Sequence, residues 1–248
     1  LVEENTVTLQ EYTEQVYPVN IGAFDSLLKT LLEHGIEKVV MIGKVNKDHL
    51  FSLDFDKRMQ KLLASLDNLN DDSILRAVAA EFISEGLEVI PQMTYLEDLI
   101  PEPGILTDDT PPPELKNDMK FGFSTALKIG ELDIGQTVIV RDQTVLAVEA
   151  AEGTDQTIKR GGRLAGGGIV MAKVCKPGQD HRLDIPTLGL NTIENLISVE
   201  ARGLILEAGK TFLLDKNKFI EKANRAGITV IAVDSESFAK SGDLPWDM

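Results

Sequence analysis

The chain has few of the residues on which several classes of protein depend. Among its 248 residues are one cysteine and three histidines, so an internal disulfide is excluded, and no HExxH or HxxxH spacing indicates a histidine-based zinc site. We expect a packing role for Cys175. No apolar run approaches the ~20 residues that a membrane helix needs, and no signal-peptide pattern opens the chain. We therefore expect a cytoplasmic protein whose contact with a membrane, if it has one, is peripheral.

Basic residues are also scarce. The chain has 25 Lys and Arg against 40 Asp and Glu, a formal net charge of -15, and such a chain repels a phosphate backbone on average. We therefore expect no nucleic-acid partner. The exception is a cationic segment over residues 159–182, and its local charge favours a small anionic ligand. Its charged residues are Lys159, Arg160, Arg163, Lys173, Lys176 and Arg182, against Asp180 alone.

The common glycine-containing catalytic and nucleotide-binding motifs are absent. There is no GxGxxG, no GxSxG elbow and no P-loop. The glycines that interrupt the cationic segment instead predict a loop, which could close over a ligand or stay mobile. These glycines are Gly161, Gly162, Gly166, Gly167 and Gly168.

The first half alternates predicted strands and helices, as βαβ units do. Helices are predicted at residues 24–32, 56–66 and 71–84, and strands at 16–20, 39–42 and 87–90. Gly43-Lys44-Val45 follows the second strand, at a position where open parallel sheets admit ligands, although a tight turn explains it equally well. A proline-rich break over residues 101–113 then predicts a domain boundary, with domains at 1–112 and 113–248.

The second half is also predicted to be α/β. Thr154 is expected to cap a short helix, so that the amides after Gly153 face a ligand, although a helix cap alone explains it as well. Asn191 with Glu194 predicts the start of another helix, ended by Gly203, and the tail after Asp234 is expected to be loosely held. Other helices are predicted at 114–129 and 215–226, and strands at 138–140, 145–148, 169–174, 204–207, 211–214 and 228–233.

The segment from Lys173 to Gly189, KVCKPGQDHRLDIPTLG, is too polar for ordinary core. Its two prolines disfavour helix, so we expect a strand that leads into a loop, where α/β proteins display reactive side chains. Asp180 and Asp184 could hold a divalent cation such as Mg²⁺ or Mn²⁺, or orient a water. Three cations of the segment could neutralise a phosphate-bearing ligand: Lys173, Lys176 and Arg182.

Several motifs occur in the order and spacing of one family. They are Gly43-Lys44-Val45, NDDSILR at 70–76, DIGQ at 133–136, AVEAAEGTD at 147–155, the segment at 173–189, and Glu207-Ala208-Gly209. The chain resembles the UDP-2,3-diacylglucosamine diphosphatases of the lipid A pathway, in the form unrelated to the calcineurin-like phosphoesterases. The resemblance covers nearly the whole chain, and its second-domain motifs are long and specific.

The resemblance implies a Rossmann-like N-terminal domain, a second α/β domain of unusual topology, and a substrate held between them. It implies a magnesium-dependent pyrophosphatase that hydrolyses UDP-2,3-diacylglucosamine to UMP and 2,3-diacylglucosamine 1-phosphate, with peripheral contact at the inner membrane. A homodimer is left open. The first strand and glycine-rich loop of the family, of the GLIAGGG kind, have no counterpart before Leu1, so we expect the sequence to be incomplete there and uridine contacts cannot be assigned. Asn70 stands where the family pattern has glycine.

The resemblance also implies roles for individual residues. Asp184 matches the aspartate that the family needs for hydrolysis, and Asp184 with Asp180 would hold the metal. A diphosphate bears charge that must be offset before water attacks, which the cations and the metal could supply. The implied substrate-binding residues are Gly43, Lys44, Gly153, Thr154, Asp155, Lys173, Lys176, Gln179, Asp180, Arg182 and Thr187.

Two other functions remain open from the sequence. The chain could hydrolyse a soluble nucleotide sugar, with Phe51, Leu53 and Phe55 serving as core rather than as an acyl-chain contact. It could also bind a nucleotide sugar without turnover. Asp184 argues against a pure binder, because such a protein gains little from carboxylates placed among its phosphate-neutralising lysines.

Overall fold

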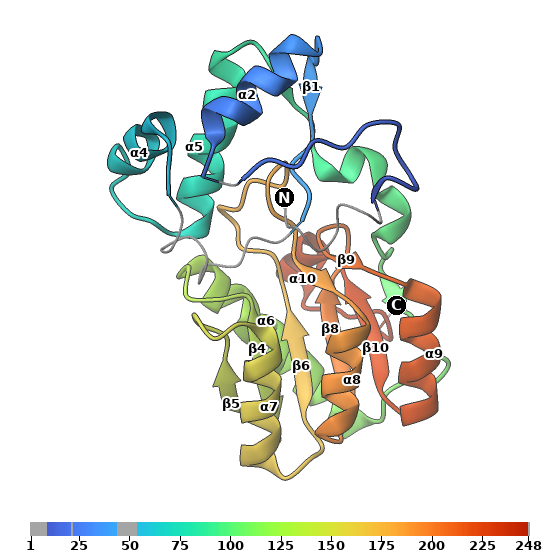
Figure 1. Ribbon diagram of the computed structural model, residues 1–248. Coiled ribbons are helices and arrows are strands. Elements are labelled where there is room, and N and C mark those ends of the chain that lie inside the picture. Colours follow the sequence, from blue (N-terminus) through green and yellow to red (C-terminus); the bar gives the residue numbers. More distant parts are fainter. Residues whose placement is uncertain (1–8, 21, 44–53, 248) are drawn as a thin grey trace. The chain divides into compact units, whose positions relative to one another are not determined.

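The chain forms two compact units, residues 1–94 and 95–248 (Figure 1). The computed structural model describes residues 9–20, 22–43 and 54–247. The division falls before the proline-rich break, not at residues 112/113, because the intervening segment contributes to the second unit. Within it, strand β3 (Gly104–Ile105) pairs antiparallel with β10 (Thr229–Val233). Two short 3₁₀ helices, Gln92–Tyr95 and Glu97–Leu99, precede it.

The first unit contains a parallel pair of short strands with helices between them. Strand β1 (Lys38–Val39) pairs with β2 (Glu88–Val89), as the βαβ prediction requires. The helices confirm the predicted ones, and side chains cap two of them: the Asp56 carboxylate accepts from the Met59 amide at 2.8 Å, and the Asn70 side chain from the Ser73 amide at 2.8 Å. Among the described residues of this unit, the helices are α2 (Phe24–Glu33), α4 (Lys57–Ala64) and α5 (Asp71–Ser84).

One prediction for this unit was wrong, and others are not tested by the described residues. Residues 16–20, all of them described, form no strand, and Pro18 lacks the N–H that a ladder needs. The Rossmann-like assignment stays a prediction. Lys44, Phe51 and Leu53 lie outside the described residues.

The second unit is built on a mixed six-stranded sheet in the order β3-β10-β8-β6-β4-β5. Its centre is parallel: β6 (Val170–Lys173) pairs with β8 (Gly203–Glu207), and β8 with β10. The remaining strands are antiparallel, including the predicted hairpin of β4 (Thr137–Arg141) and β5 (Thr144–Val148). The α/β prediction for this half is confirmed, and the antiparallel strands flanking the parallel core make the sheet mixed.

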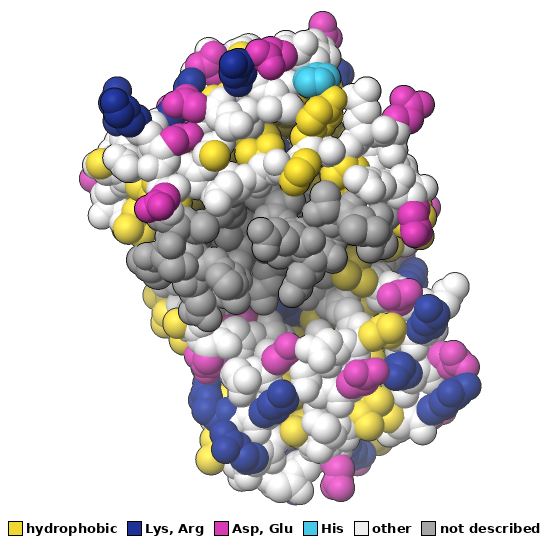
Figure 2. Space-filling view, in the orientation of Figure 1, with side chains coloured by type: hydrophobic (Ala, Val, Ile, Leu, Met, Phe, Trp, Pro, Cys, Tyr) yellow, Lys and Arg dark blue, Asp and Glu magenta, His cyan; other side chains and the backbone are white. Residues whose placement is uncertain are grey.

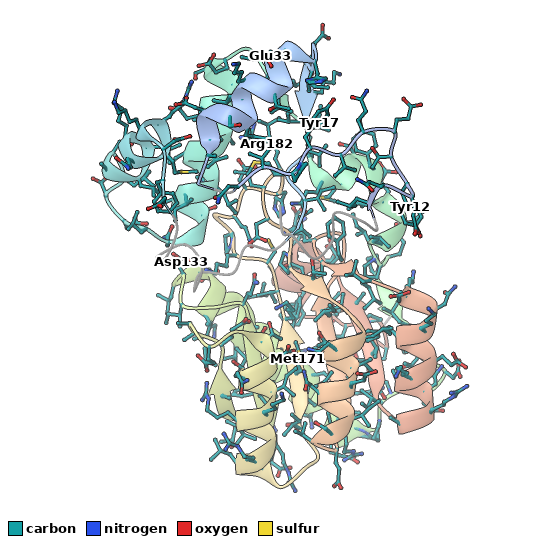
Figure 3. All side chains as sticks on the ribbon, in the orientation of Figure 1. Tyr12, Tyr17, Glu33, Asp133, Met171 and Arg182 are labelled. Carbon is teal, nitrogen blue, oxygen red and sulfur yellow. The ribbon has the colours of Figure 1, made fainter. Side chains whose placement is uncertain are left out.

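Helices cover both faces of this sheet (Figure 1). Because side chains alternate across a strand, Val170 and Ala172 pack with α6 (Pro113–Glu131) on one face, while Met171, labelled in Figure 3, packs with the helices of the other. Beside the sheet, β7 (Thr187–Leu188) pairs parallel with β9 (Phe212–Leu213). The face opposite α6 carries α7 (Thr154–Ala165), α8 (Leu190–Ser198) and α9 (Lys216–Ala226).

Two predictions for the second unit were wrong. The tail after Asp234 is not loosely held: α10 (Ser235–Ser241) packs the Phe238 ring edge-on against Phe123, 5.1 Å between centroids, and Leu244 is buried. The sequence alone did not show this contact, because Phe123 lies more than a hundred residues before Phe238. Helix α8 also ends at Ser198, and Gly203 opens β8 instead of closing the helix.

The predicted glycine loop is also only half correct. Gly161 and Gly162 lie inside α7, and only Gly166, Gly167 and Gly168 follow it, all with positive φ. A Cβ built on Gly162 would lie 2.4 Å from Val199 Cβ, and one on Gly161 2.6 Å from Ile139 Cγ2. These two glycines therefore let α7 approach β4 and the end of α8 closely, which helix propensity alone does not show.

We expect Gly162→Ala to destabilise the second unit, although alanine is the better helix former. The added methyl must displace Val199 in a packed interface, which lowers the free energy of unfolding by about 1–3 kcal/mol. Urea unfolding followed by the fluorescence of Trp246, the one tryptophan of the chain, measures this. Lys159→Ala, at an exposed position of the same helix, is the control and should unfold at or above the wild-type midpoint. A stable Gly162→Ala variant would contradict the packing role.

Acidic and basic side chains are interspersed on the face shown in Figure 2. In the part of the chain that the structure describes, no helix has the length and apolar character needed to cross a membrane.

Candidate functional site

The candidate site of the second unit lies at the carboxyl ends of β6 and β8. Parallel strands end at the same edge of a sheet, where open α/β sheets bind ligands, and Lys173 and Glu207 are the last residues of these two strands. The first turn of α7 and the loop between β6 and β7 meet this edge. These segments carry ten of the predicted site residues: Gly153, Thr154, Asp155, Lys173, Lys176, Gln179, Asp180, Arg182, Asp184 and Thr187.

Lys173 is a buried charge at the centre of this edge. Its side chain is 2% exposed, and Nζ donates to Thr137 Oγ1 at 3.1 Å and Thr154 Oγ1 at 2.9 Å. Nζ also lies 3.7 Å from Glu149 Oε2. Burial lowers the pKa of Lys173, an effect that the carboxylates of Glu149, Asp184 and Asp155 oppose. The hydrogen bond to Thr154 brings the start of α7 against the lysine.

Thr154 links this lysine to α7, but not as the predicted cap. Gly153, with φ +77°, is the N-cap, and Thr154 is the first helical residue. The Thr154 hydroxyl donates to Glu149 Oε1 at 2.8 Å and accepts from Lys173. Because that hydroxyl bonds to Glu149 and Lys173, it does not cap the backbone amides of α7.

Asp155 joins α7 to α8. Its carboxylate accepts from Asn191 Nδ2 at 2.6 Å and from Asn195 Nδ2 at 2.9 Å. The sequence predicted that Asn191 starts α8, and this was wrong. Gly189 is the N-cap, and Asn191 is the second residue of the helix. The two amides hold the Asp155 carboxylate in place, which makes it a structural tie between the helices as well as a candidate contact.

The β6–β7 loop pairs most of its cations with carboxylates. Lys176 Nζ lies 2.7 Å from Asp133 Oδ1, and the Arg182 guanidinium reaches both oxygens of Asp180 at 2.7–3.2 Å. Figure 3 labels Asp133 and Arg182. These partially exposed pairs can open to a ligand at little cost, because exposed ion pairs are worth only about 0–1 kcal/mol.

Asp184 is exposed at the end of this loop, and Gln179 Nε2 donates a hydrogen bond to its Oδ2. Its backbone amide bonds to the Asp180 carbonyl at 3.1 Å. Further along, Thr187 opens β7, and its hydroxyl donates to the Ile185 carbonyl at 3.0 Å. An exposed carboxylate is suited to binding a cation or a water.

The described oxygen donors fit a hard divalent cation only in part. Within residues 9–20, 22–43 and 54–247, no three His, Cys, Asp or Glu residues form a metal cluster. Mg²⁺ is commonly held by one or two carboxylates together with substrate phosphates, and the exposed Asp184 suits this. Asp180 would first have to release Arg182. Gly43, with φ +122°, belongs to the first unit, and Lys44 lies outside the described residues.

Sequence reasoning missed three buried members of the site. Glu149 and Thr137 contact Lys173, and Glu207 accepts from the Cys175 backbone amide at 2.7 Å. Glu149 and Glu207 lie inside two of the motifs quoted above, but a glutamate in a motif does not show which cation it faces. Only the pairing of strands distant in sequence brings these partners together.

Fold and site together define an α/β protein whose second unit places a buried lysine and an exposed aspartate at the carboxyl edge of a mixed sheet. Residues 1–99 match the LpxI N-terminal domain family, and residues 102–231 the LpxI C-terminal domain family. The UDP-2,3-diacylglucosamine pyrophosphatase LpxI of Caulobacter vibrioides is 34% identical over 229 residues, which cover 88% of this chain and 82% of that protein. The chain belongs to the LpxI family.

Among solved structures, Acinetobacter baumannii RibD (form 2) aligns with 50% of this chain and 37% of its own, at 15% identity and a TM-score of 0.31. That likeness is too slight to bear on the fold or the function.

Proposed function

We propose that this chain hydrolyses the diphosphate bond of UDP-2,3-diacylglucosamine, releasing UMP and 2,3-diacylglucosamine 1-phosphate in lipid A biosynthesis. Family membership and the 34% identity to the Caulobacter vibrioides pyrophosphatase support the reaction and the substrate. The structural observation that carries the proposal is the edge formed by the carboxyl ends of β6 and β8, where an α/β sheet binds its ligand. The buried Lys173 lies at this edge, and the loop that carries the exposed Asp184 leads away from it.

In this proposal the Lys173 cation acts on the substrate without contacting it. Lys173 donates to Thr154 and not to solvent, so its charge reaches the diphosphate through the first turn of α7. That turn points its unpaired backbone amides towards an anion bound at Gly153, and helix N-termini favour negative charge. Lys176 and Arg182 exchange their carboxylate partners for phosphate oxygens. Together these groups offset the charge that would repel an attacking water.

Asp184 has the chemical role in this proposal. Its carboxylate orients the attacking water at the diphosphate, or binds Mg²⁺ together with substrate phosphate oxygens. The magnesium ion, when bound, supplies electrostatic stabilisation to the phosphoryl oxygens. Asp180 is the second candidate ligand.

Removing the divalent cation is expected to abolish turnover without unfolding the protein. The described candidate ligands are two carboxylates of one exposed loop, so the metal binds weakly without substrate and contributes little to the fold. Turnover and melting temperature are to be measured in excess EDTA and after Mg²⁺ or Mn²⁺ is restored. Full activity in EDTA, or a melting temperature that collapses, would contradict this assignment.

The function itself is tested by comparing acylated and non-acylated UDP-glucosamine as substrates, with UMP release as the readout. Turnover of the acylated sugar alone supports the proposal. Equal turnover of both would identify a hydrolase of soluble nucleotide sugars, and binding of either sugar without UMP release would identify a binding protein.

A further inference from the structure

The side-chain amide of Gln179 lies between Asp184 and the buried part of the site. Its Nε2 donates to Asp184 Oδ2, while its Oε1 accepts from the Cys175 thiol, 3.2 Å from Sγ, and from the Lys176 backbone amide at 3.4 Å. A glutamine amide has an oxygen that only accepts and a nitrogen that only donates. Two donors on Oε1 therefore turn Nε2 towards the carboxylate.

Cys175 is itself anchored in the core. Its backbone amide donates to Glu207 Oε2 at 2.7 Å, and Glu207, 2% exposed, also accepts from Lys210 Nζ at 2.9 Å and from the Ser235 hydroxyl. Burial, with the nearby Glu207 charge, raises the pKa of Cys175 to about 12, so the thiol keeps its proton at neutral pH. Two other polar atoms lie farther from its sulfur: the Lys176 carbonyl oxygen at 3.6 Å and His181 Nδ1 at 3.9 Å.

We propose that Gln179 is a positioning residue that holds the Asp184 carboxylate for hydrolysis, and that Cys175 is a second positioning residue, which sets the orientation of the Gln179 amide. This inference rests on the proposed function, because that function gives Asp184 its part in turnover. It replaces the phosphate contact that the family resemblance implies for Gln179 with a contact to the reacting carboxylate. It also gives the one cysteine a hydrogen-bonding role where the sequence predicted packing.

The physical reason lies in the exposure of Asp184. An exposed aspartate exchanges between rotamers, and a small misplacement of a reacting group slows turnover by up to about 10²-fold. A hydrogen bond from Gln179 selects one rotamer. That restraint is only as rigid as Gln179 itself, and the contact with Cys175 connects it to the core through Glu207.

Kinetics of four variants test the inference: Gln179→Met, Cys175→Ala, Cys175→Ser and the double variant Cys175→Ala/Gln179→Met. We expect Gln179→Met to lower kcat by about 10-fold to 10²-fold with little change in KM. Cys175→Ala should lower kcat less, and Cys175→Ser should recover most of the loss, because its hydroxyl still donates. The double variant should be no slower than Gln179→Met alone, since Cys175 acts through Gln179.

Other outcomes overturn the inference. A raised KM with unchanged kcat in Gln179→Met would make Gln179 a phosphate contact. Multiplied losses in the double variant would separate Cys175 from Gln179. Gln143→Met is the control and should retain wild-type kinetics. Gln143 lies in the exposed turn between β4 and β5, which follows the end of β4 that is distant from the Thr137–Lys173 pair. Melting temperatures identify any variant that fails to fold. If Cys175→Ala is such a variant, the kinetics of Gln179→Met and Cys175→Ser test the inference.

A measurement without substrate separates this inference from the proposed function. The side-chain amide signals of Gln179, identified in ¹H–¹⁵N spectra of the full chain by their loss in Gln179→Met, should shift in both Cys175→Ala and Asp184→Asn. Unchanged signals would overturn the network whatever the substrate is. Shifted signals in a protein that releases no UMP would uphold the network and refute the proposed function alone.

Discussion

The Asp184→Asn variant is expected to lose turnover by about 10²-fold or more, the low end for a positioned acid or base, and to keep its melting temperature. Asparagine preserves the size of the side chain and one acceptor oxygen for Gln179, but removes the charge. Because Asp184 is exposed, the free energy of unfolding should change little. Turnover, substrate affinity and melting temperature are to be measured together on wild type and variant.

Substrate should still bind to this variant. Loss of one carboxylate reduces repulsion of the diphosphate, so affinity is expected to stay the same or rise where the metal is not the main contact. Retained turnover would refute the catalytic role of Asp184, and loss of activity with a collapsed melting temperature would make the residue structural.

Replacing Lys173 is expected to have the largest effect on stability. Lys173→Met fills the space of the buried side chain but leaves the Glu149 carboxylate, 11% exposed, without its cation. Breaking a buried ion pair in this way lowers the free energy of unfolding by about 3–5 kcal/mol. Urea unfolding monitored by Trp246 fluorescence reports the second unit directly.

The double variant Glu149→Gln/Lys173→Met distinguishes charge from packing. With the carboxylate neutralised, it should recover most of the lost stability while remaining inactive, since the cation behind α7 is gone. Lys159→Met, an exposed replacement on α7, is the matched control and should be neutral. Equal destabilisation of the single and double variants would show that the lysine stem, rather than its charge, holds the site.

Local signals predicted most helices and the polar segment on which the candidate site is built. Helix α4 begins after Asp56 because that carboxylate caps it, and α9 ends before Gly227 because glycine adopts φ +68° there. The polar segment at 173–189 was recognisable because prolines and clustered charges are unsuited to a core. Such signals act over a few residues, so a linear pattern can carry them.

The remaining features depend on partners distant in sequence. Lys176 pairs with Asp133, and Lys173 with Glu149 and Thr137, and no spacing rule selects these partners. In the sequence, Gly161 and Gly162 of α7 are typical of a loop. Their role in helix packing is seen only from their close contacts with Ile139 of β4 and with Val199. Burial of Lys173 is the clearest case, since the sequence predicted a cation that could neutralise a phosphate and did not show which side chains enclose it.

The strand β3 also determines where the second unit can be separated from the first. It covers the outer side of β10, where Leu106 N donates to the Val230 carbonyl at 2.8 Å and Val230 N donates to Thr107 Oγ1 at 3.0 Å. A fragment begun at the proline run would leave β10 as an open sheet edge, a template on which copies of the chain associate. Residues 104–107 therefore also protect the outer edge of β10 from pairing with another chain.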